Sequence, residues 1–303
     1  METVYNTVYN AVLITVALAF VLGLALYIFQ DKLIYQPNPA VLNFPTPDDN
    51  PERYRNPGDR GISYDDVNVT TADRVKLHAW YMRCGPSQAP TVVYFQANAG
   101  NMGLRMDLFE LIVKQCRVNI FAVSYRGYGF SEGIPTEKGL MEDADAALKH
   151  VFSSNMSAGG VYIMGASLGG AVSIYAAAAH RNLPVRSMQI KGVIIENTFT
   201  SLPSLVDVLM PAISFLKSLV LRNYWPSLTR IPLITAPILM IAGTSDELIP
   251  HAHMKALRAA AQSAKYVDWF EVEGGEHNTT WQTAGDAYTR RIHQFIDRTL
   301  SIK

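Results

Sequence analysis

Short apolar segments alternate with amphipathic segments over most of the chain after residue 62. Two early segments, SYDDVNVTT and KLHAWYMR, predict an antiparallel pair of strands with a turn near residues 72–73. Six later segments are short, apolar and β-branched or aromatic, and each predicts a strand: Thr91–Phe95, Asn119–Tyr125, Val161–Gly165, Gly192–Glu196, Pro237–Gly243 and Val267–Val272. Helices are predicted over Met102–Cys116, Glu137–Phe152, Gly169–His180, His251–Ala264 and Gly285–Leu300. This alternation predicts an α/β fold with a mainly parallel, eight-stranded sheet and helices on both faces.

One interval breaks the alternation between the sixth and seventh predicted strands. Residues 201–230 are leucine-rich and helical in pattern, so we expect a helical insertion in a domain that runs over 62–303. In sheets of this kind, functional residues gather at the carboxyl ends of the strands. The insertion is therefore either a lid over such a site or a pair of helices with no role in it.

The N-terminal segment is apolar enough to enter a membrane. No charged residue occurs between Glu2 and Asp31, and Ala11–Phe29 is apolar at every position but one. As a helix this run would span about 29 Å, which is close to the hydrocarbon thickness of a bilayer. A cleaved signal peptide would have basic residues before the run, and a core helix would have a polar face, but neither is present. We predict one transmembrane anchor over residues 11–30, preceded by a short tail over 1–10.

A proline-rich segment follows the predicted anchor. Six prolines occur in Gln36–Gly61, so residues 31–61 are expected to form a juxtamembrane linker without long regular structure. The linker is either an extended tether or a coil that lies on the domain. Lys32 is the single basic residue close to the anchor, so charge bias does not determine the membrane orientation.

Charge and cysteine content exclude several classes of function. The 26 basic and 26 acidic residues balance and no basic run is present, so we expect no nucleic-acid partner. The two cysteines, Cys84 and Cys116, are too few for a disulfide framework. They could form one bridge with each other or remain as two free thiols, and we expect two free thiols. No cluster of cysteine and histidine has metal-ligand spacing, so we expect neither a metal nor an organic cofactor.

The strand Val161–Gly165 runs directly into a turn with the pattern G-x-S-x-G, in which Ser167 is flanked by Gly165 and Gly169. Close packing of a helix on a strand, or a helix cap, would explain these small residues without any chemistry. A serine nucleophile needs the same small neighbours, because it stands on a strained turn and the N–H of Leu168 must point at a developing oxyanion. We interpret Ser167 as a nucleophile because candidates for its partners follow at later strand ends.

A carboxylate and a histidine follow in the order Ser, Asp, His. His277 lies in the loop GGEHN after the last strand, where glycines allow an imidazole to reach over the edge of the sheet. Asp246 follows the seventh strand and would hold the imidazole in one tautomer and stabilise the imidazolium. Glu196, at the end of the sixth strand, is the alternative acid, and we favour Asp246. His251 and His253 open a helix near the same edge, whereas the other histidines have positions typical of surface or packing residues.

A second oxyanion donor is expected in the turn after the third strand, within QANAGN. The backbone N–H groups of Ala97 and Asn98 are the candidates there. The same residues are equally typical of a glycine-containing entry into a helix, so the pattern by itself leaves both interpretations open.

Several segments together resemble one family of proteins. YFQANAGNMGLR, YRGYGFSEGIPTEKGL, MGASLGGAVS, ENTFTSLP, GTSDELIP and EHNTTW are similar to motifs of the Bem46-like branch of the α/β-hydrolases, most closely the α/β-hydrolase domain-containing protein 13 type. The resemblance implies the α/β-hydrolase fold and a single-pass membrane protein. It also implies Ser167, Asp246 and His277 as a catalytic triad, with the N–H groups of Leu168 and Asn98 as oxyanion donors.

The chain departs from this family at one point. Where the family usually has H-G-N-A-G-N, the chain has Gln96 and Ala97. An alanine at a position that is usually glycine is expected to restrain the loop that carries the second oxyanion donor.

These patterns predict a membrane-anchored serine hydrolase that cleaves esters or thioesters through an acyl-enzyme. An apolar insertion and an anchor fit acyl-chain substrates, either lipid esters or S-acylated proteins, with the lipid bilayer as the partner surface. We expect an endomembrane location such as the endoplasmic reticulum, on an undetermined side. The alternatives are a weakly active or inactive hydrolase-fold scaffold that binds a membrane partner, and an esterase or peptidase with a soluble substrate.

Overall fold

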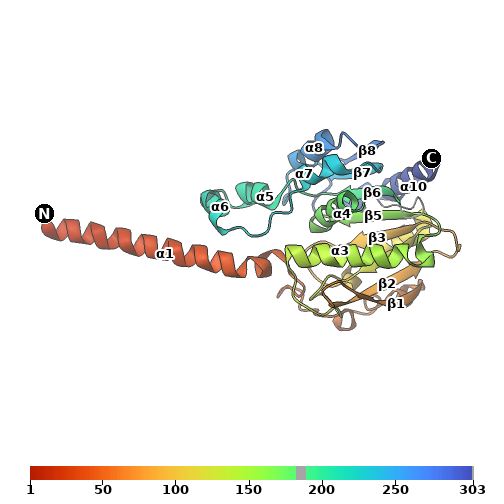
Figure 1. Cartoon of the computed structure of the whole chain (residues 1–303), viewed down its shortest axis with the longest axis horizontal. Coiled ribbons are helices and arrows are strands. Elements are labelled where there is room, and N and C mark those ends of the chain that lie inside the picture. Colours follow the sequence, from red (N-terminus) through yellow and green to blue (C-terminus); the bar gives the residue numbers. More distant parts are fainter. Residues whose placement is uncertain (182–188, 302–303) are drawn as a thin grey trace.

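The computed structural model of the chain describes residues 1–181 and 189–301, and its N-terminal part is one long helix. Helix α1 (Glu2–Ile34) projects away from the rest of the molecule (Figure 1). Over residues 1–22 its side chains are exposed on all sides. By length and composition it is able to cross a membrane. Residues 1–10, predicted as a tail, are almost entirely helical, because no proline or glycine interrupts the run before the apolar segment.

The predicted linker lies on the domain instead of forming an extended tether. It contains two short 3-10 helices, Pro47–Asp49 and Pro57–Arg60. The proline that begins each of them is buried. Asn50 and Asn101 exchange side-chain amide hydrogen bonds of 2.9 and 2.8 Å, which attach the linker to the loop after the third strand. The prolines prevent long regular structure, while these contacts hold the coil in place.

The predicted mainly parallel, eight-stranded sheet is confirmed. Its strands are β1 (Ser63–Thr70), β2 (Lys76–Arg83), β3 (Thr91–Phe95), β4 (Asn119–Val123), β5 (Val161–Ala166), β6 (Ile190–Glu196), β7 (Ile238–Gly243) and β8 (Val267–Val272). Their order across the sheet is β1-β2-β4-β3-β5-β6-β7-β8. Strand β2 is antiparallel to both of its neighbours, and all pairs from β4 to β8 are parallel. The carboxyl ends of the central strands therefore meet at one edge.

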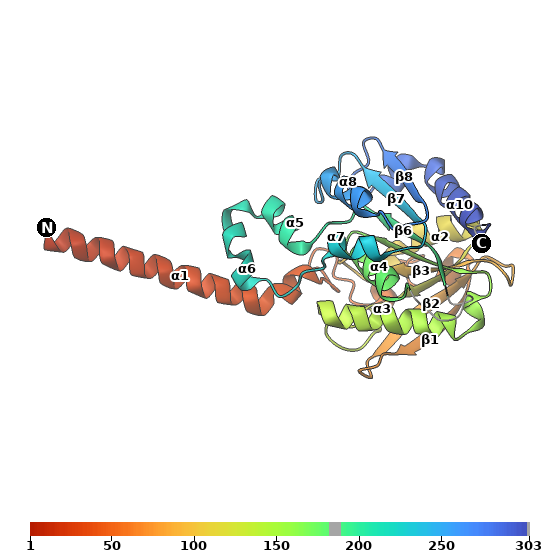
Figure 2. The ribbon, with the colours of Figure 1, turned by 45° about the horizontal axis from the view of Figure 1, so that its top comes forward.

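Helices cover both faces of the sheet, as predicted (Figure 2). One core layer lies under α3 (Glu137–Phe152), α4 (Leu168–Ala179) and α8 (His251–Ala260). The other lies under α2 (Met106–Cys116) and α10 (Asp286–Leu300), which pack against each other, while the short α9 (Thr280–Ala284) joins β8 to α10. The central strands are buried on both sides, which explains their continuous apolar sequences.

The interval between β6 and β7 is helical and lies beside the end of the N-terminal helix. It contains α5 (Leu202–Leu209), a 3-10 segment (Pro211–Leu216), α6 (Lys217–Val220) and α7 (Ser227–Arg230). Helices α5 and α6 stand next to the domain-proximal part of α1 in both ribbon views (Figures 1 and 2). The insertion and the N-terminal helix thus form one structural unit at the carboxyl edge of the sheet.

Buried hydrogen bonds join the end of α1 to the insertion. The phenol of Tyr35 donates to the side-chain oxygen of Asn223 at 2.7 Å and accepts from the indole N–H of Trp225 at 3.0 Å. All three side chains are buried. The side-chain oxygen of Gln30 accepts from the backbone N–H groups of Arg222 and Asn223 at 2.7 and 3.2 Å. The last turns of α1 are therefore part of the folded domain.

Replacing Tyr35 by phenylalanine is expected to lower the free energy of unfolding by about 1–3 kcal/mol. The change keeps the ring but leaves the buried indole N–H of Trp225 without its acceptor. Urea unfolding of the full chain in detergent micelles measures the loss. Tyr224→Phe, at a half-exposed tyrosine of the same segment, is the matched control and should be close to neutral. A Tyr35→Phe variant as stable as this control would contradict the role given to the buried hydrogen bonds.

Candidate active site

Ser167 lies at the turn from β5 into α4 and has a backbone conformation that is unusual for serine. Its φ is 54° and its ψ is −122°, a strained combination that costs a side chain about 1–3 kcal/mol. A Cβ atom at Gly165 would lie 2.2 Å from the carbonyl oxygen of Gly169, and one at Gly169 would lie 2.0 Å from that of Phe95. Both glycines are thus required by the close approach of α4 to the strands.

Neighbouring backbone groups hold this turn in place. The N–H of Ser167 donates to the carbonyl of Glu196 at 2.9 Å, and the hydroxyl of Thr198 donates to the carbonyl of Ser167 at 2.7 Å. Both partners come from the end of β6 and the residues that follow it. The serine side chain is therefore fixed at the carboxyl edge of the sheet.

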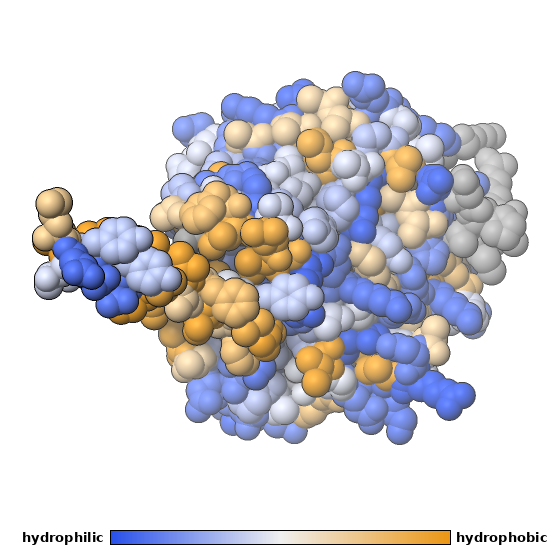
Figure 3. All heavy atoms as spheres, turned by 60° about the vertical axis from the view of Figure 1, so that its left-hand side comes forward, coloured by the Kyte–Doolittle hydropathy of each residue, from blue (hydrophilic) through white to orange (hydrophobic). Residues whose placement is uncertain are grey.

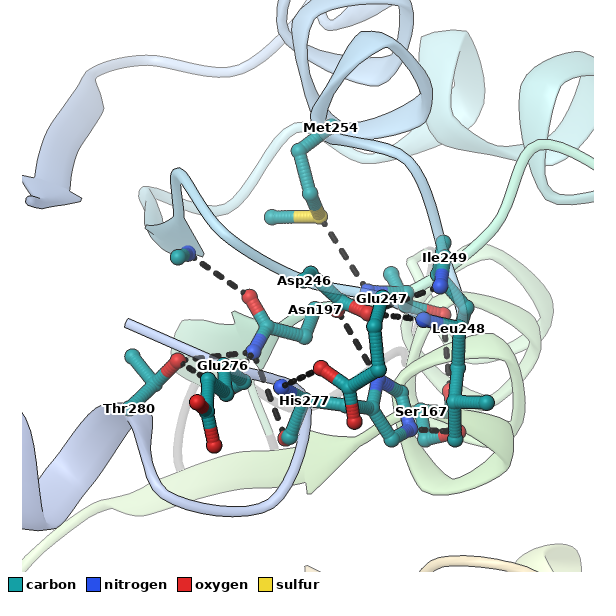
Figure 4. Close-up of polar contacts among 12 residues, drawn as sticks. Ser167, Asn197, Asp246, Glu247, Leu248, Ile249, Met254, Glu276, His277 and Thr280 are labelled. Atoms are coloured by element: carbon teal, nitrogen blue, oxygen red, sulfur yellow. Dashed lines mark hydrogen bonds and ion pairs between the residues drawn. The ribbon is translucent and has the colours of Figure 1, made fainter. Parts of the chain in front are cut away.

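The structure brings Ser167, His277 and Asp246 together in a hydrogen-bonded chain (Figure 4). Imidazole Nε2 of His277 lies 3.0 Å from the hydroxyl of Ser167, and Nδ1 lies 2.8 Å from Oδ2 of Asp246. The other carboxylate oxygen of Asp246 accepts from the backbone N–H groups of Leu248 and Ile249 at 2.9 and 2.7 Å. Since the carboxylate is an acceptor, we assign the imidazole proton to Nδ1, which leaves Nε2 free to accept the serine proton.

Asn197 holds the loop that carries His277 against the sheet. Its side-chain N–H₂ group donates to the hydroxyl of Thr280 at 2.9 Å, and its oxygen accepts from the N–H of Gly243 at 2.8 Å. The side chain is buried and joins the ends of β6 and β7 to the histidine loop. The sequence analysis did not identify Asn197, although an asparagine directly after a buried strand is a recognisable polar signal.

The carboxyl group of Glu196 points away from the histidine. It accepts a 2.5 Å hydrogen bond from the phenol of Tyr288 in α10 and is fully buried beneath the sheet edge. Burial raises the pKa of Glu196 to about 7, while the hydrogen bond from Tyr288 and the nearby His277 act in the opposite direction. Of the two candidate acids, the structure places Asp246 against His277 and Glu196 against Tyr288.

His251 and His253 have other partners. His251 stacks on the ring of Trp269, and Nδ1 of His253 accepts from the backbone N–H of Thr200 at 3.2 Å. Burial lowers the pKa of His253. Within residues 1–181 and 189–301, neither imidazole is hydrogen-bonded to Ser167 or Asp246.

The two predicted oxyanion donors belong to neighbouring segments. Leu168 is the first residue of α4, so its N–H has no acceptor within the helix. Ala97 and Asn98 border the same cavity as Ser167, Leu168 and His277. The residues that carry the candidate N–H groups thus border the same cavity as the serine.

The juxtamembrane segment clamps the loop that contains Asn98. The carbonyl of Asn98 accepts from the backbone N–H of Gln36 at 2.9 Å and from the phenol of Tyr128 at 2.7 Å. The side-chain N–H₂ group of Asn98 donates to the carbonyl of Ile34 at 3.1 Å, and the N–H of Gly100 donates to the carbonyl of Gln36 at 2.9 Å. These contacts, which the sequence analysis did not anticipate, fix the loop from the end of the N-terminal helix.

A cavity of about 510 Å³ extends from Ser167 and His277 between the N-terminal helix and the insertion. Most of its wall is apolar: Leu26, Leu33 and Ile34 come from α1, Leu202, Leu205, Val206 and Leu209 from α5, and Leu216, Val220 and Leu221 from α6 and the adjoining residues. A cavity of this shape and lining is suited to an alkyl chain whose polar end lies beside the serine.

In the described part of the chain, no group of three or more histidine, cysteine, aspartate or glutamate side chains is arranged to hold a metal ion. Cys84 and Cys116 are both free thiols.

Comparison with known proteins defines the class of the chain. Residues 90–216 match the family described as the alpha/beta hydrolase fold. The esterase Pf2001 of Pyrococcus furiosus has a similar structure, with a TM-score of 0.65 and 20% sequence identity, over 80% of this chain and 93% of that chain. The sheet order and the strand-to-helix turn at Ser167 agree with this class. The protein is an α/β-hydrolase-fold protein.

Relatives in three eukaryotes define the family more closely. Alpha/beta hydrolase domain-containing protein WAV2 of Arabidopsis thaliana is 34% identical over 293 residues, which cover 92% of this chain and 91% of that protein. Protein bem46 of Schizosaccharomyces pombe is 32% identical over 275 residues, covering 89% and 87%. Membrane protein YNL320W of Saccharomyces cerevisiae is 32% identical over 286 residues, covering 93% of each. The chain belongs to the Bem46-like family, which confirms the predicted resemblance.

The buried carboxyl of Glu196 is expected to make stability depend on pH. An unfolded glutamate releases its proton near 4.5, whereas folded Glu196 keeps it up to about pH 7, so the folded state binds more protons within this window. The free energy of unfolding should therefore fall as the pH rises from 4.5 to 7, by at most about 3 kcal/mol from this group.

Glu196→Gln should remove this part of the pH dependence, which urea unfolding at a series of pH values measures. Glu273→Gln changes an exposed glutamate and serves as the control. If the free energy of unfolding changed with pH equally in the Glu196→Gln variant and in the wild-type protein, the raised pKa of Glu196 would be contradicted.

Proposed function

We propose that this protein is a membrane-anchored serine hydrolase that cleaves carboxylic esters or thioesters of acyl chains. The observation that carries the proposal is the hydrogen-bonded chain from Ser167 through His277 to Asp246 beside an apolar cavity. A hydrolase fold and esterase structural neighbours support the reaction class.

In the proposed first step, Ser167 attacks the carbonyl carbon of the bound acyl group. Nε2 of His277 takes the hydroxyl proton, and Asp246 stabilises the imidazolium that results. The negative charge moves to the carbonyl oxygen, where the N–H groups of Leu168 and Asn98 donate hydrogen bonds. When the tetrahedral intermediate collapses, the bond to the alcohol or thiol breaks, and His277 returns the proton to this leaving group.

The second step releases the acyl chain. A water molecule gives a proton to His277 and attacks the acyl-enzyme, which restores the serine hydroxyl and yields a carboxylic acid. Neither step uses a metal or an organic cofactor. The strained turn at Ser167 presents the hydroxyl before substrate arrives, so little reorganisation is needed during the reaction.

The apolar cavity and the N-terminal helix support the substrate class. An alkyl chain in the cavity would replace water along walls contributed by α1, α5 and α6, at about 0.8 kcal/mol per buried methylene. Helix α1 supports single-pass anchoring, and one relative is named a membrane protein. Lipid esters and S-acylated proteins present acyl chains at such a surface. An endomembrane location stays a prediction, which cell fractionation tests.

A fluorophosphonate should form a covalent adduct with Ser167, and Ser167→Ala should abolish the labelling. The reason is that the probe reacts only with a serine activated by a neighbouring base. Ser173→Ala, at a buried serine of the same helix that does not line the cavity, is the matched control and should still be labelled. Mass spectrometry of the labelled peptide identifies the site. Failure of the wild-type protein to react would favour the inactive scaffold instead.

Asp246→Asn should lower kcat on a short ester by about four orders of magnitude, because the amide would favour the wrong imidazole tautomer. Glu196→Gln should have a far smaller effect, since Glu196 is bonded to Tyr288. Steady-state kinetics of both variants on one chromogenic ester gives the comparison. If Glu196→Gln were the more damaging substitution, the acid would have to be assigned to the end of β6.

A further inference from the structure

The turn and helix after α5 carry an unusually apolar exposed surface. Residues 208–220, called here the insertion tip, include five large apolar side chains that are 46–78% exposed: Val208, Leu209, Met210, Phe215 and Leu219. In Figure 3 hydrophobic side chains gather where α1 meets the domain. A contiguous surface of this kind marks an interaction site.

Hydrogen bonds fix the insertion tip at a definite level along the N-terminal helix. The side-chain N–H₂ group of Gln30 donates to the carbonyl of Val220 at 2.9 Å. The guanidinium of Arg222 donates to the carbonyl of Tyr27 at 3.1 Å and pairs with Asp31 at 3.0 Å. A Cβ atom at Gly23 would lie 3.9 Å from a methyl group of Val220. The tip therefore lies beside residues 23–30 of α1.

This level lies within the part of α1 that is proposed to cross the bilayer. The apolar run ends at Phe29, and Gly23 precedes it by six residues, which is about 9 Å along a helix. Apolar faces of interfacial helices enter the boundary between headgroups and acyl chains to a depth of about 5–10 Å. With Phe29 at the membrane surface, Val220 and its neighbours would reach this depth.

The charges near the insertion tip fit the same position. Lys217 and Asp207 form an ion pair with each other, and Arg222 and Asp31 form another at the level where the apolar run ends. Paired charges close to the headgroups avoid the cost of a lone charge in hydrocarbon. The insertion tip can therefore enter one leaflet without burying an unpaired ionic group.

We propose that the insertion tip is immersed in the leaflet next to the domain, and that acyl chains enter the cavity laterally from this leaflet. Leu26 and Leu33 of α1 line the same cavity as Leu216 and Val220 of the insertion and as Ser167. An acyl chain would thus pass from hydrocarbon to an apolar wall without crossing water. The proposal rests on the anchored hydrolase proposed above, and the bilayer is the single partner it requires.

The position of the insertion tip is tested by fluorescence quenching in the full-length Ser167→Ala protein, so that the result does not depend on catalysis. Single cysteines at Leu18, Leu219 and Leu300 are labelled with an environment-sensitive nitrobenzoxadiazole dye in a Cys84→Ser background, because Cys116 is buried. Leu18 lies in the middle of the apolar run, and Leu300 is the last residue of α10, a helix that lies far from α1 (Figure 1). The protein is reconstituted in phosphatidylcholine vesicles with or without a doxyl group on the acyl chain.

Doxyl lipid should quench the dye at positions 18 and 219 and leave the dye at position 300 unaffected. Quenching at 18 without quenching at 219 would overturn the proposal while the anchor itself remained in the membrane. Absence of quenching at both positions would overturn the anchor, and the insertion-tip proposal with it.

Lateral entry is tested by activity with two kinds of substrate. Phe215→Glu combined with Leu219→Glu should lower hydrolysis of a vesicle-borne acyl ester by about tenfold or more and leave kcat/KM on a short soluble ester within about twofold. Neither residue lines the cavity, and Leu300→Glu is the matched control. Equal loss on both substrates, or no loss on either, would overturn lateral entry. Failure of the wild-type protein on both substrates would instead overturn the proposed hydrolase activity.

Discussion

The sharp turn at Ser167 is the constraint on which the rest of the site depends. Ser167 has a φ of 54°, and this turn brings α4 very close to β5. Cβ atoms at positions 165 and 169 would prevent this approach, so both positions are glycine. The same approach brings α4 against the carbonyl of Phe95 at the end of β3. The loop after β3 therefore starts beside this turn, and its residues Ala97 and Asn98 line the same cavity as the serine.

The N-terminal helix is a wall of the site as well as the proposed membrane anchor. Ile34 and Gln36 are hydrogen-bonded to the loop that contains Asn98, and Tyr35 is buried against the insertion. A displacement of the helix would thus be transmitted to the loop proposed to stabilise the oxyanion. This connection explains why the segment after α1 lies on the domain although its six prolines would also permit an extended tether.

Much of the fold was predictable because its signals are local. Apolar strands alternating with amphipathic helices predicted the sheet, and helix α3 was predicted with its observed bounds. Ser167, Asp246 and His277 were found as candidates because each directly follows a recognisable strand. Asn197 was missed: its place directly after a strand is a local signal, but the distant loop that it joins to two strand ends is not encoded nearby. Helix α1 continues back through residues 2–10, which were predicted as a short tail, because no proline or glycine ends the helical run there.

By itself, the sequence determined the apolar N-terminal helix, the order of strands and helices, and the small-residue turn around Ser167. Periodicity, helix length and turn chemistry depend on residues within a few positions of one another. Only the tertiary structure decided that Asp246 and not Glu196 faces His277, and that an apolar cavity runs between α1 and the insertion. These features depend on contacts between residues far apart in the chain, such as Tyr35 and Asn223, which are separated by 188 positions. A local sequence pattern does not determine which distant residue a side chain contacts, because the packing of the elements against one another sets these contacts.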